Sequence, residues 1–213
     1  MPKLLARSLV FACLVLCGLL SAPALAETDD EPLVEKKTGL TFPVQVGKFR
    51  RTGWQVYPDP RMGIVIRYDG PGRAEAFVYD LGLGAIPTGV DSEAVTDAFA
   101  RAKADVERLL TAPPASAAKK FAESTPVLER EGRVAKVRVA VYSWTYTAPD
   151  GTGGPMATWV LVTGFKNKFL KLVYTSPSLD PLAAQGDVKE LVYDFLEANP
   201  KERQNFLTEK KAP

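Results

Sequence analysis

Apolar and polar residues alternate at the spacing of β-strands in the first third of the chain. The alternation is clearest in Met62–Asp69 and Arg73–Leu81, which are separated by the turn sequence Asp69-Gly70-Pro71-Gly72. Two such segments joined by a tight turn predict an antiparallel hairpin. The mixed segment Phe49–Tyr57, which is closed by Pro58-Asp59-Pro60, is expected to be a further strand.

A second group of strands is predicted after residue 130. Val134–Thr147 is a long run of β-branched and aromatic residues, and the glycine-rich sequence Asp150–Gly154 follows it as a turn. Met156–Phe165 and Lys168–Ser176 are expected to pair as a hairpin around Lys166-Asn167, because Asn tolerates a positive φ.

Apolar residues at helical spacing predict two α-helices. The first is expected between a cap at Asp91 or Ser92 and a stop at Pro113-Pro114, and the second over Asp187–Asn199. The Ala-rich segment Ala115–Ser124 is expected to add a short helix. The two apolar stripes are Val95, Ala98, Phe99, Ala102, Val106, Leu109 and Leu110 in the first helix, and Val188, Leu191, Val192, Phe195 and Leu196 in the second.

This order of elements predicts an α+β domain. Three strands, a helix, three strands and a final helix (β3-α-β3-α) give an antiparallel sheet of about six strands flanked by helices. A doubly wound dinucleotide fold would need strands that alternate with helices. A single domain is expected over residues 41–199, after a flexible polar leader at 27–40 and before a charged tail at 200–213.

Three segments of the predicted domain, together with the order of its elements, carry a resemblance to a known family. They are the initial sequence Thr41-Phe42-Pro43 and the strands Gly63–Tyr68 and Val78–Leu81. Over about Thr41–Asn199 the chain resembles the PsbP-like superfamily of exported proteins, whose fold is an antiparallel sheet flanked by helices. The resemblance implies a binding or accessory role, because members are mostly non-catalytic, and it implies no site residues.

The start of the chain has the three parts of a secretory signal peptide. The basic segment Met1–Arg7 is followed by the apolar run Leu9–Leu20 and by the small-residue site Ala24-Leu25-Ala26, after which cleavage is expected. Twelve apolar residues are fewer than the ~20 that span a bilayer, so we expect a periplasmic or secreted protein without a transmembrane anchor. A lipoprotein site at Cys17 is the weaker alternative, since the bulky Leu16 precedes it.

Composition excludes several classes of chemistry. The 213-residue chain has no His, and both of its cysteines, Cys13 and Cys17, lie in the predicted signal peptide. Disulfides, zinc sites, cysteine nucleophiles and His-based triads are therefore excluded from the mature protein. An enzyme would need Asp, Glu, Lys or Tyr as its proton carrier, and a metal would be a hard cation bound by oxygen. We expect no cofactor.

The charge balance argues against nucleic-acid binding. Of the 27 basic residues, Lys3 and Arg7 belong to the predicted signal, which leaves 25 basic residues against 25 acidic ones. The mature chain therefore lacks the basic surplus that phosphate binding needs. Lys166, Lys168 and Lys171 surround one predicted hairpin, where they either touch an anionic surface or, as we prefer, form a charged edge that discourages pairing between molecules.

Motif-like sequences do not combine into a catalytic or metal site. Ser116-Ala117-Ala118-Lys119 and Lys37-Thr38-Gly39 fit the S-x-x-K and K-T-G elements of penicillin-interacting serine enzymes, but their order is reversed and Ser-Asp-Asn is absent. Gly82-Leu83-Gly84 lacks the third glycine of a dinucleotide loop, and Asp150–Gly154 lacks the alternating ligands of a calcium loop. We therefore predict no catalytic, cofactor-binding or metal-binding residues.

The candidate contact surface is an aromatic row on Val134–Thr147. Strand alternation places Tyr142, Trp144 and Tyr146 on one face and valines on the other. The strand is either buried on both sides beneath helices, or it leaves this row open toward a ligand or partner. Both alternatives remain open at the level of sequence.

These patterns indicate an exported, non-catalytic binding or accessory protein of the bacterial cell envelope. Its partner would be an unknown envelope protein or a small ligand. A carboxylate-dependent envelope hydrolase is the alternative from another class, and it requires two acids that converge on a cleft. A structural stabiliser of an envelope complex is the third alternative.

Overall fold

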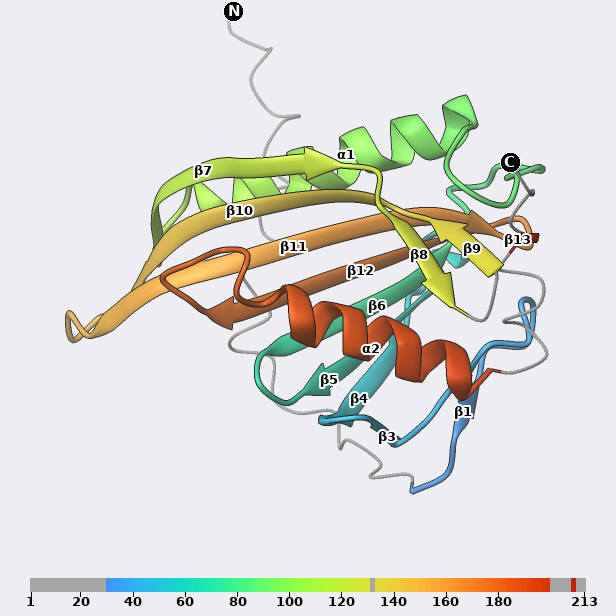
Figure 1. The fold of residues 1–213 in the computed structure, drawn as a ribbon, viewed down its shortest axis with the longest axis horizontal. Coiled ribbons are helices and arrows are strands. Elements are labelled where there is room, and N and C mark those ends of the chain that lie inside the picture. The colour runs from blue at the N-terminus through green and yellow to red at the C-terminus, as the bar shows by residue number, and fades with distance from the viewer. Residues whose placement is uncertain (1–29, 131–132, 200–207, 210–213) are drawn as a thin grey trace, which may run out of the picture.

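The structure, a computed structural model, describes residues 30–130, 133–199 and 208–209, so the predicted signal peptide lies outside the described residues. An eight-stranded antiparallel sheet forms the middle of the fold (Figure 1). In spatial order its strands are β3 (Gln45–Val46), β4 (Phe49–Val56), β5 (Ile64–Asp69), β6 (Arg73–Tyr79), β12 (Lys168–Pro177), β11 (Gly153–Phe165), β10 (Arg138–Thr147) and β7 (Ala115–Ser124).

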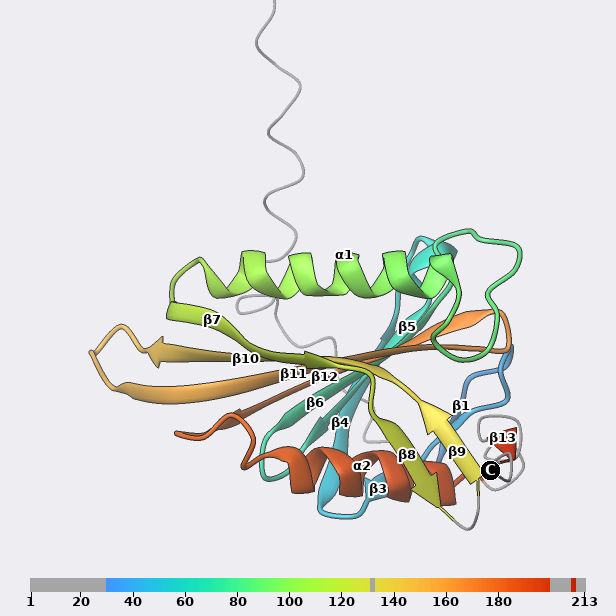
Figure 2. The ribbon, with the colours of Figure 1, turned by 45° about the horizontal axis from the view of Figure 1, so that its top comes forward.

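Two helices lie on opposite faces of this sheet. Figure 2 shows α1 (Glu93–Leu110) on one side and α2 (Gln185–Glu197) on the other. Within the described residues, neither helix is long and apolar enough to cross a membrane. The smaller elements are a pair of strands, β1 (Leu33–Val34) and β2 (Thr41–Phe42), a second small sheet of β8 (Val127–Arg130), β9 (Arg133–Lys136) and β13 (Thr208–Glu209), and the 3-10 helix η2 (Pro60–Met62).

Each face of the sheet has its own hydrophobic core, because strand side chains alternate. On β10, Val139 and Val141 belong to the core that includes α2, whereas Ala140 and Tyr142 belong to the core that includes α1. Val139–Tyr142 of β10 and Ala157–Phe165 of β11 are thus buried on both sides, which explains why these parts of the two strands are mostly apolar.

Several predicted elements are confirmed together with the local signals that define them. β5 and β6 form the expected hairpin, and β11 and β12 pair around Lys166 and Asn167, whose φ angles are 46° and 60°. Ser92, rather than Asp91, caps α1, since its hydroxyl accepts a hydrogen bond from the Val95 amide at 3.3 Å. The α+β class with an antiparallel sheet is confirmed.

The number of strands and one helix differ from the prediction. Ala115–Ser124 is not a helix but β7, which pairs with β10 at seven positions and forms one edge of the sheet. The ladder with β10 outweighs the helix propensity of its alanines. The run Val134–Thr147 is divided between β9 and β10, because the chain passes from the small sheet into the large sheet near Val137. The large sheet therefore has eight strands rather than about six.

The segments expected to flank the domain are partly paired. Within 27–40, Leu33–Val34 pairs with Thr41–Phe42, and Thr38 and Leu40 are buried, so the expectation of a flexible leader is wrong for this part. The segment is polar on average, so its composition did not indicate the paired strand or the buried Thr38 and Leu40. Within the expected tail, Thr208–Glu209 pairs with β9, and the rest of 200–213 lies outside the described residues.

Candidate functional site

An apolar cavity of about 110 Å³ lies between α2 and the sheet and is partly open to solvent. Its floor comes from β6, β12 and β11, its roof from α2, and one wall from the β2–β3 region. The residues that define it best are Phe42, Ala76, Leu161, Leu172, Leu191 and Phe195.

The register of the sheet and the periodicity of α2 position these side chains. Ala76, Leu172 and Leu161 are cross-strand partners on adjacent strands, so they form one row on the α2 face. Leu191 and Phe195 are four residues apart and project from the same side of α2. The Phe195 ring tilts against Phe42, with 5.2 Å between centroids. The small Ala76 leaves the space that larger neighbours would fill.

The polar groups in the cavity wall already have partners. The Tyr68 hydroxyl donates a hydrogen bond to the Pro43 carbonyl at 3.0 Å, and the Thr163 hydroxyl lies 3.3 Å from the carbonyl oxygens of Gly89 and Lys136. Burial raises the pKa of Tyr68, so its hydroxyl stays neutral. No Asp or Glu is among the described residues that line the cavity, and Lys171 is the charged residue among them. The rest of the lining is mostly apolar, so the site suits hydrocarbon.

Ion pairs and a hydrogen bond connect the first half of α2 to Lys48 and Tyr174, beside the cavity. Lys48 forms an ion pair with Glu190 at 2.9 Å and approaches Asp187 at 3.8 Å, and the hydrogen bond to Glu190 raises the pKa of Lys48. The Tyr174 hydroxyl lies 3.3 Å from the Asp187 carboxylate, and burial raises the pKa of Tyr174 to about 12. No side chain caps the start of α2 at Ala184. The helix is therefore held by its neighbours and by its apolar face.

The predicted aromatic row is divided between the interior and the surface. Tyr142 is 1% exposed, lies beneath α1, and donates its hydroxyl to the Glu107 carboxylate at 3.0 Å. Trp144 is half-buried and donates its indole N–H to Thr158 at 3.0 Å, whereas Tyr146 is exposed. The open-face interpretation therefore fails for Tyr142, because α1 covers it, and a partner could reach only the end of the row.

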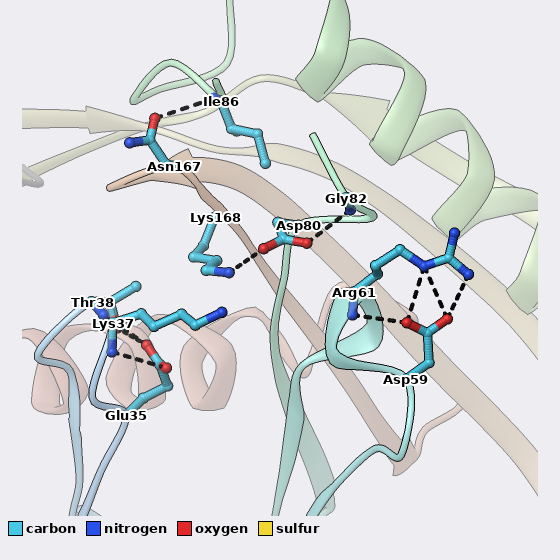
Figure 3. Close-up of polar contacts among 10 residues, drawn as sticks. All are labelled: Glu35, Lys37, Thr38, Asp59, Arg61, Asp80, Gly82, Ile86, Asn167 and Lys168. Atoms are coloured by element: carbon cyan, nitrogen blue, oxygen red, sulfur yellow. Dashed lines mark hydrogen bonds and ion pairs between the residues drawn. The ribbon is translucent and has the colours of Figure 1, made fainter. Parts of the chain in front are cut away.

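Loops at one end of the sheet meet in a polar cluster (Figure 3). Lys168 on β12 forms an ion pair with Asp80 after β6, and the second Asp80 oxygen accepts the Gly82 amide at 2.8 Å. Burial alone would raise the pKa of Asp80, but the hydrogen bonds from Lys168 and Gly82 and the charges of Lys168 and Lys37 lower it below the usual value. The cluster joins these loops to one another.

The lysines of the β11–β12 hairpin do not form the charged edge that we preferred. β12 lies between β6 and β11 in the middle of the sheet, so its side chains have no free edge to protect. Lys166 donates to the Thr38 carbonyl at 2.9 Å, Lys168 pairs with Asp80, and Lys171 lies over Phe77. The interpretation was wrong because the sequence shows which strands are adjacent in the chain, not which are central.

The structure does not bring the motif-like sequences together. Ser116 and Lys119 lie on the edge strand β7. Ser116 pairs with Thr145 of β10, which in turn pairs with Pro155 near the start of β11. Lys37-Thr38-Gly39 forms the turn between β1 and β2 beside Lys166, at the other end of β11. In the described part of the chain, no group of three or more Asp, Glu, His or Cys side chains could hold a metal ion.

Comparison with known proteins yields a similarity of fold. No protein-family model matches the chain, and a search of curated proteins finds no match. Among solved structures, the chain is similar to the solution structure of cyanobacterial PsbP (CyanoP) from Synechocystis sp. PCC 6803, with 12% identity and a TM-score of 0.45, over 83% of this chain and 98% of that one. This similarity is one of fold alone.

Proposed function

We propose that this chain is an exported, non-catalytic binding protein of the bacterial cell envelope that holds a hydrocarbon segment in the cavity beneath α2. The observation that supports this proposal is the cavity lining, in which the apolar residues of three strands and one helix face an open space. Ligand sites of this kind are concave and mostly apolar.

The size of the cavity limits the part of a ligand that enters it. An apolar cavity of ~150 Å³ stays dry and takes a benzene molecule, and the present cavity measures about 110 Å³. A single ring or the end of an acyl chain fits this space. A polar group would lose its water without a replacement, because Tyr68 and Thr163 already have hydrogen-bond partners.

Decanoate is a suitable probe, since its chain can enter the cavity while its carboxylate stays outside. We expect the melting temperature to rise with decanoate concentration, because a ligand that binds only the folded state stabilises it. Ala76→Leu should fill the cavity and abolish this rise. Ala122→Leu is the matched control, because Ala122 packs on the same face but is not among the cavity residues. No rise in the wild type, or an unchanged rise in Ala76→Leu, would contradict the proposal.

Export is the second part of the proposal and has its own test. It is supported by the basic start, apolar run and small-residue site of residues 1–26. Protein recovered from the periplasm should begin at Glu27 in N-terminal sequencing. Recovery of the chain with Met1 intact from that fraction would contradict cleavage.

The alternatives differ in what they require. The hydrolase gains no support from the cavity, since none of its described lining residues is Asp or Glu. A structural stabiliser would be recovered with a stoichiometric partner from the envelope fraction. Decanoate would then leave the melting temperature of the protein unchanged.

A further inference from the structure

The two edges of the large sheet differ in how they are protected from pairing with another strand. At one edge, β7 shifts register against β10 at two places and carries the charged residues Lys119, Lys120 and Glu123 (Figure 1). Bulges and charges of this kind discourage a further strand from pairing. At the other edge, β3 pairs with β4 only at Phe49 and Arg50, and no described strand continues along that side of β4.

The part of β4 left without a neighbour, Thr52–Val56, is an open edge that carries no charge. Its apolar side chains Trp54 and Val56 are 38% and 60% exposed. Their partners on β5 are Ile66 and Ile64, which belong to the core beneath α2. Cross-strand partners share a face, so both exposed side chains project from the α2 face. An uncharged edge strand with exposed apolar side chains is a template for a further strand.

The hydrogen bond from the Tyr57 amide to the Gly63 carbonyl, at 2.9 Å, shows which backbone groups of the open edge face outward. In an antiparallel ladder, hydrogen-bonded pairs alternate with pairs that are not hydrogen-bonded. Tyr57 and Gln55 are therefore directed toward β5. The N–H and C=O groups of Trp54 and Val56 point away from β5, toward the open side.

A second copy of the open edge matches these outward groups in one antiparallel register. When Trp54 lies opposite Val56 of the second copy, each outward N–H meets a C=O of the other strand. Two-fold symmetry repeats the contact, so each Trp54 packs on a Val56. An aromatic and a β-branched side chain form a stabilising cross-strand pair. The exposed apolar side chains of both copies are thereby covered.

The flanking residues favour this register over its neighbours. It places Tyr57 of the second copy opposite Gly53, where no atom lies within 4 Å of the position that a Cβ would take. The nearest shift that keeps the same face brings in Pro58, which has no N–H to donate. The shift in the other direction brings in Thr52, the extra residue of the bulge in β4. An unrelated peptide would have to supply these matching residues, whereas a second copy carries them.

We propose that the open edge is a dimerisation surface, at which two copies of this chain join their large sheets into one. The two-fold axis passes between the Gln55 residues of the two copies, perpendicular to the sheet, so both α2 helices lie on the same side. The contact involves few residues on each strand and is smaller than a stable interface. The dimer therefore forms as the concentration rises and dissociates on dilution.

Sedimentation equilibrium of the intact protein over a series of concentrations tests the proposal. We expect the mass to rise from that of one chain to that of two and no further, because a two-fold contact is closed. Val56→Glu should weaken dimerisation at least about tenfold, since it buries a carboxylate against Trp54 of the second copy. Phe121→Glu is the matched control, because Phe121 is 48% exposed on the opposite edge, and it should dimerise like the wild type.

The same measurements separate the proposal from other causes of association. A mass of one chain at every concentration would overturn it, and would leave the open edge to an unrelated peptide. Association through the apolar run Leu9–Leu20 or through β7 would persist in Val56→Glu, which would also overturn it. Circular dichroism spectra like that of the wild type show that both variants are folded.

Cross-linking tests the register without the use of Val56→Glu. In the proposed register the Gln55 residues form a pair that is not hydrogen-bonded, with Cα atoms about 4.5 Å apart, within the range of a disulfide. Gln55→Cys should therefore give a covalent dimer on mild oxidation. Thr52→Cys, exposed on the same strand, lies far from its copy and should cross-link at least about tenfold more slowly. The wild type, with Cys13 and Cys17, gives the background rate. Equal rates in the two variants, or no covalent dimer of Gln55→Cys, would overturn the proposal.

Discussion

The side-chain amide of Asn199 forms hydrogen bonds with both the backbone N–H and the backbone carbonyl of Thr41. Its amide oxygen accepts the Thr41 N–H at 2.7 Å, and its amide nitrogen donates to the Thr41 carbonyl at 2.8 Å. The same nitrogen lies 2.9 Å from the Phe195 carbonyl, so the last turn of α2 is joined to β2 across 158 positions of sequence. This contact holds the roof of the cavity against its wall.

Asn199→Ala should therefore destabilise the protein. Asn199 is 4% exposed, and its removal leaves the Thr41 backbone groups without their partners. We expect a loss of about 2 kcal/mol in the free energy of unfolding, measured by urea denaturation. Gln185→Ala, at the exposed start of α2, is the control. Equal losses in the two variants would contradict this role of Asn199.

Phe195→Ala should cost about 3 kcal/mol, at the lower end of the usual range for Phe because the ring is only half-buried. The substitution removes the contact with Phe42 and enlarges the cavity. Leu109→Ala, on the exposed side of α1, should stay within about 0.5 kcal/mol of the wild type. Thermal and urea unfolding of the two variants measure the difference, and a loss below about 1 kcal/mol in Phe195→Ala would show that α2 docks without this ring.

Elements bounded by local signals could be predicted from the sequence. Ser92 caps α1 through an amide three residues away, and Lys166-Asn167 closes a hairpin between adjacent strands. These interactions depend on neighbours in the chain. The strand at Ala115–Ser124 depends on β10, whose partner residues lie 15 to 31 positions further along, so local propensity led to the wrong element.

The cavity could not be predicted for the same physical reason. Phe42, Ala76, Leu172 and Phe195 belong to four elements. The pairing of β6 with β12 places Ala76 beside Leu172, and the docking of α2 brings Phe195 against Phe42. Periodicity identified Leu172 and Phe195 as apolar but not as neighbours. Nor could it show that α1 covers Tyr142, because an amphipathic stripe does not specify which strands it packs on.

Tyr142→Phe and Tyr146→Phe distinguish the buried from the exposed end of the aromatic row. Removal of the Tyr142 hydroxyl leaves Glu107 without its hydrogen bond and should cost about 1 kcal/mol. The exposed Tyr146 should tolerate the same change within about 0.5 kcal/mol. Urea unfolding of both variants provides the comparison, and a larger loss at Tyr146 would contradict the burial of Tyr142 under α1.

The ion pair of Asp80 and Lys168 predicts a pH dependence of stability. The side chains are 18% and 10% exposed, so solvent screens the pair little. Since the folded-state pKa of Asp80 lies below its unfolded value, the ionised form stabilises the fold. This stabilisation is fully present above the unfolded-state pKa of about 3.9, and it is lost as the pH falls through the lower folded-state pKa.

Asp80→Asn isolates this contribution, because the amide can still accept the Gly82 N–H but cannot pair with Lys168. At pH 7 we expect the variant to lose about 3 kcal/mol relative to the wild type. The difference should shrink as the pH falls below about 4, since the wild-type carboxylate then becomes neutral as well. Asp59→Asn, whose ion pair with Arg61 is more exposed, should show a much smaller loss at pH 7. Urea unfolding from pH 7 to pH 2 measures both variants, and a wild-type advantage over Asp80→Asn that stayed constant over this range would show that the charge of Asp80 does not stabilise the fold.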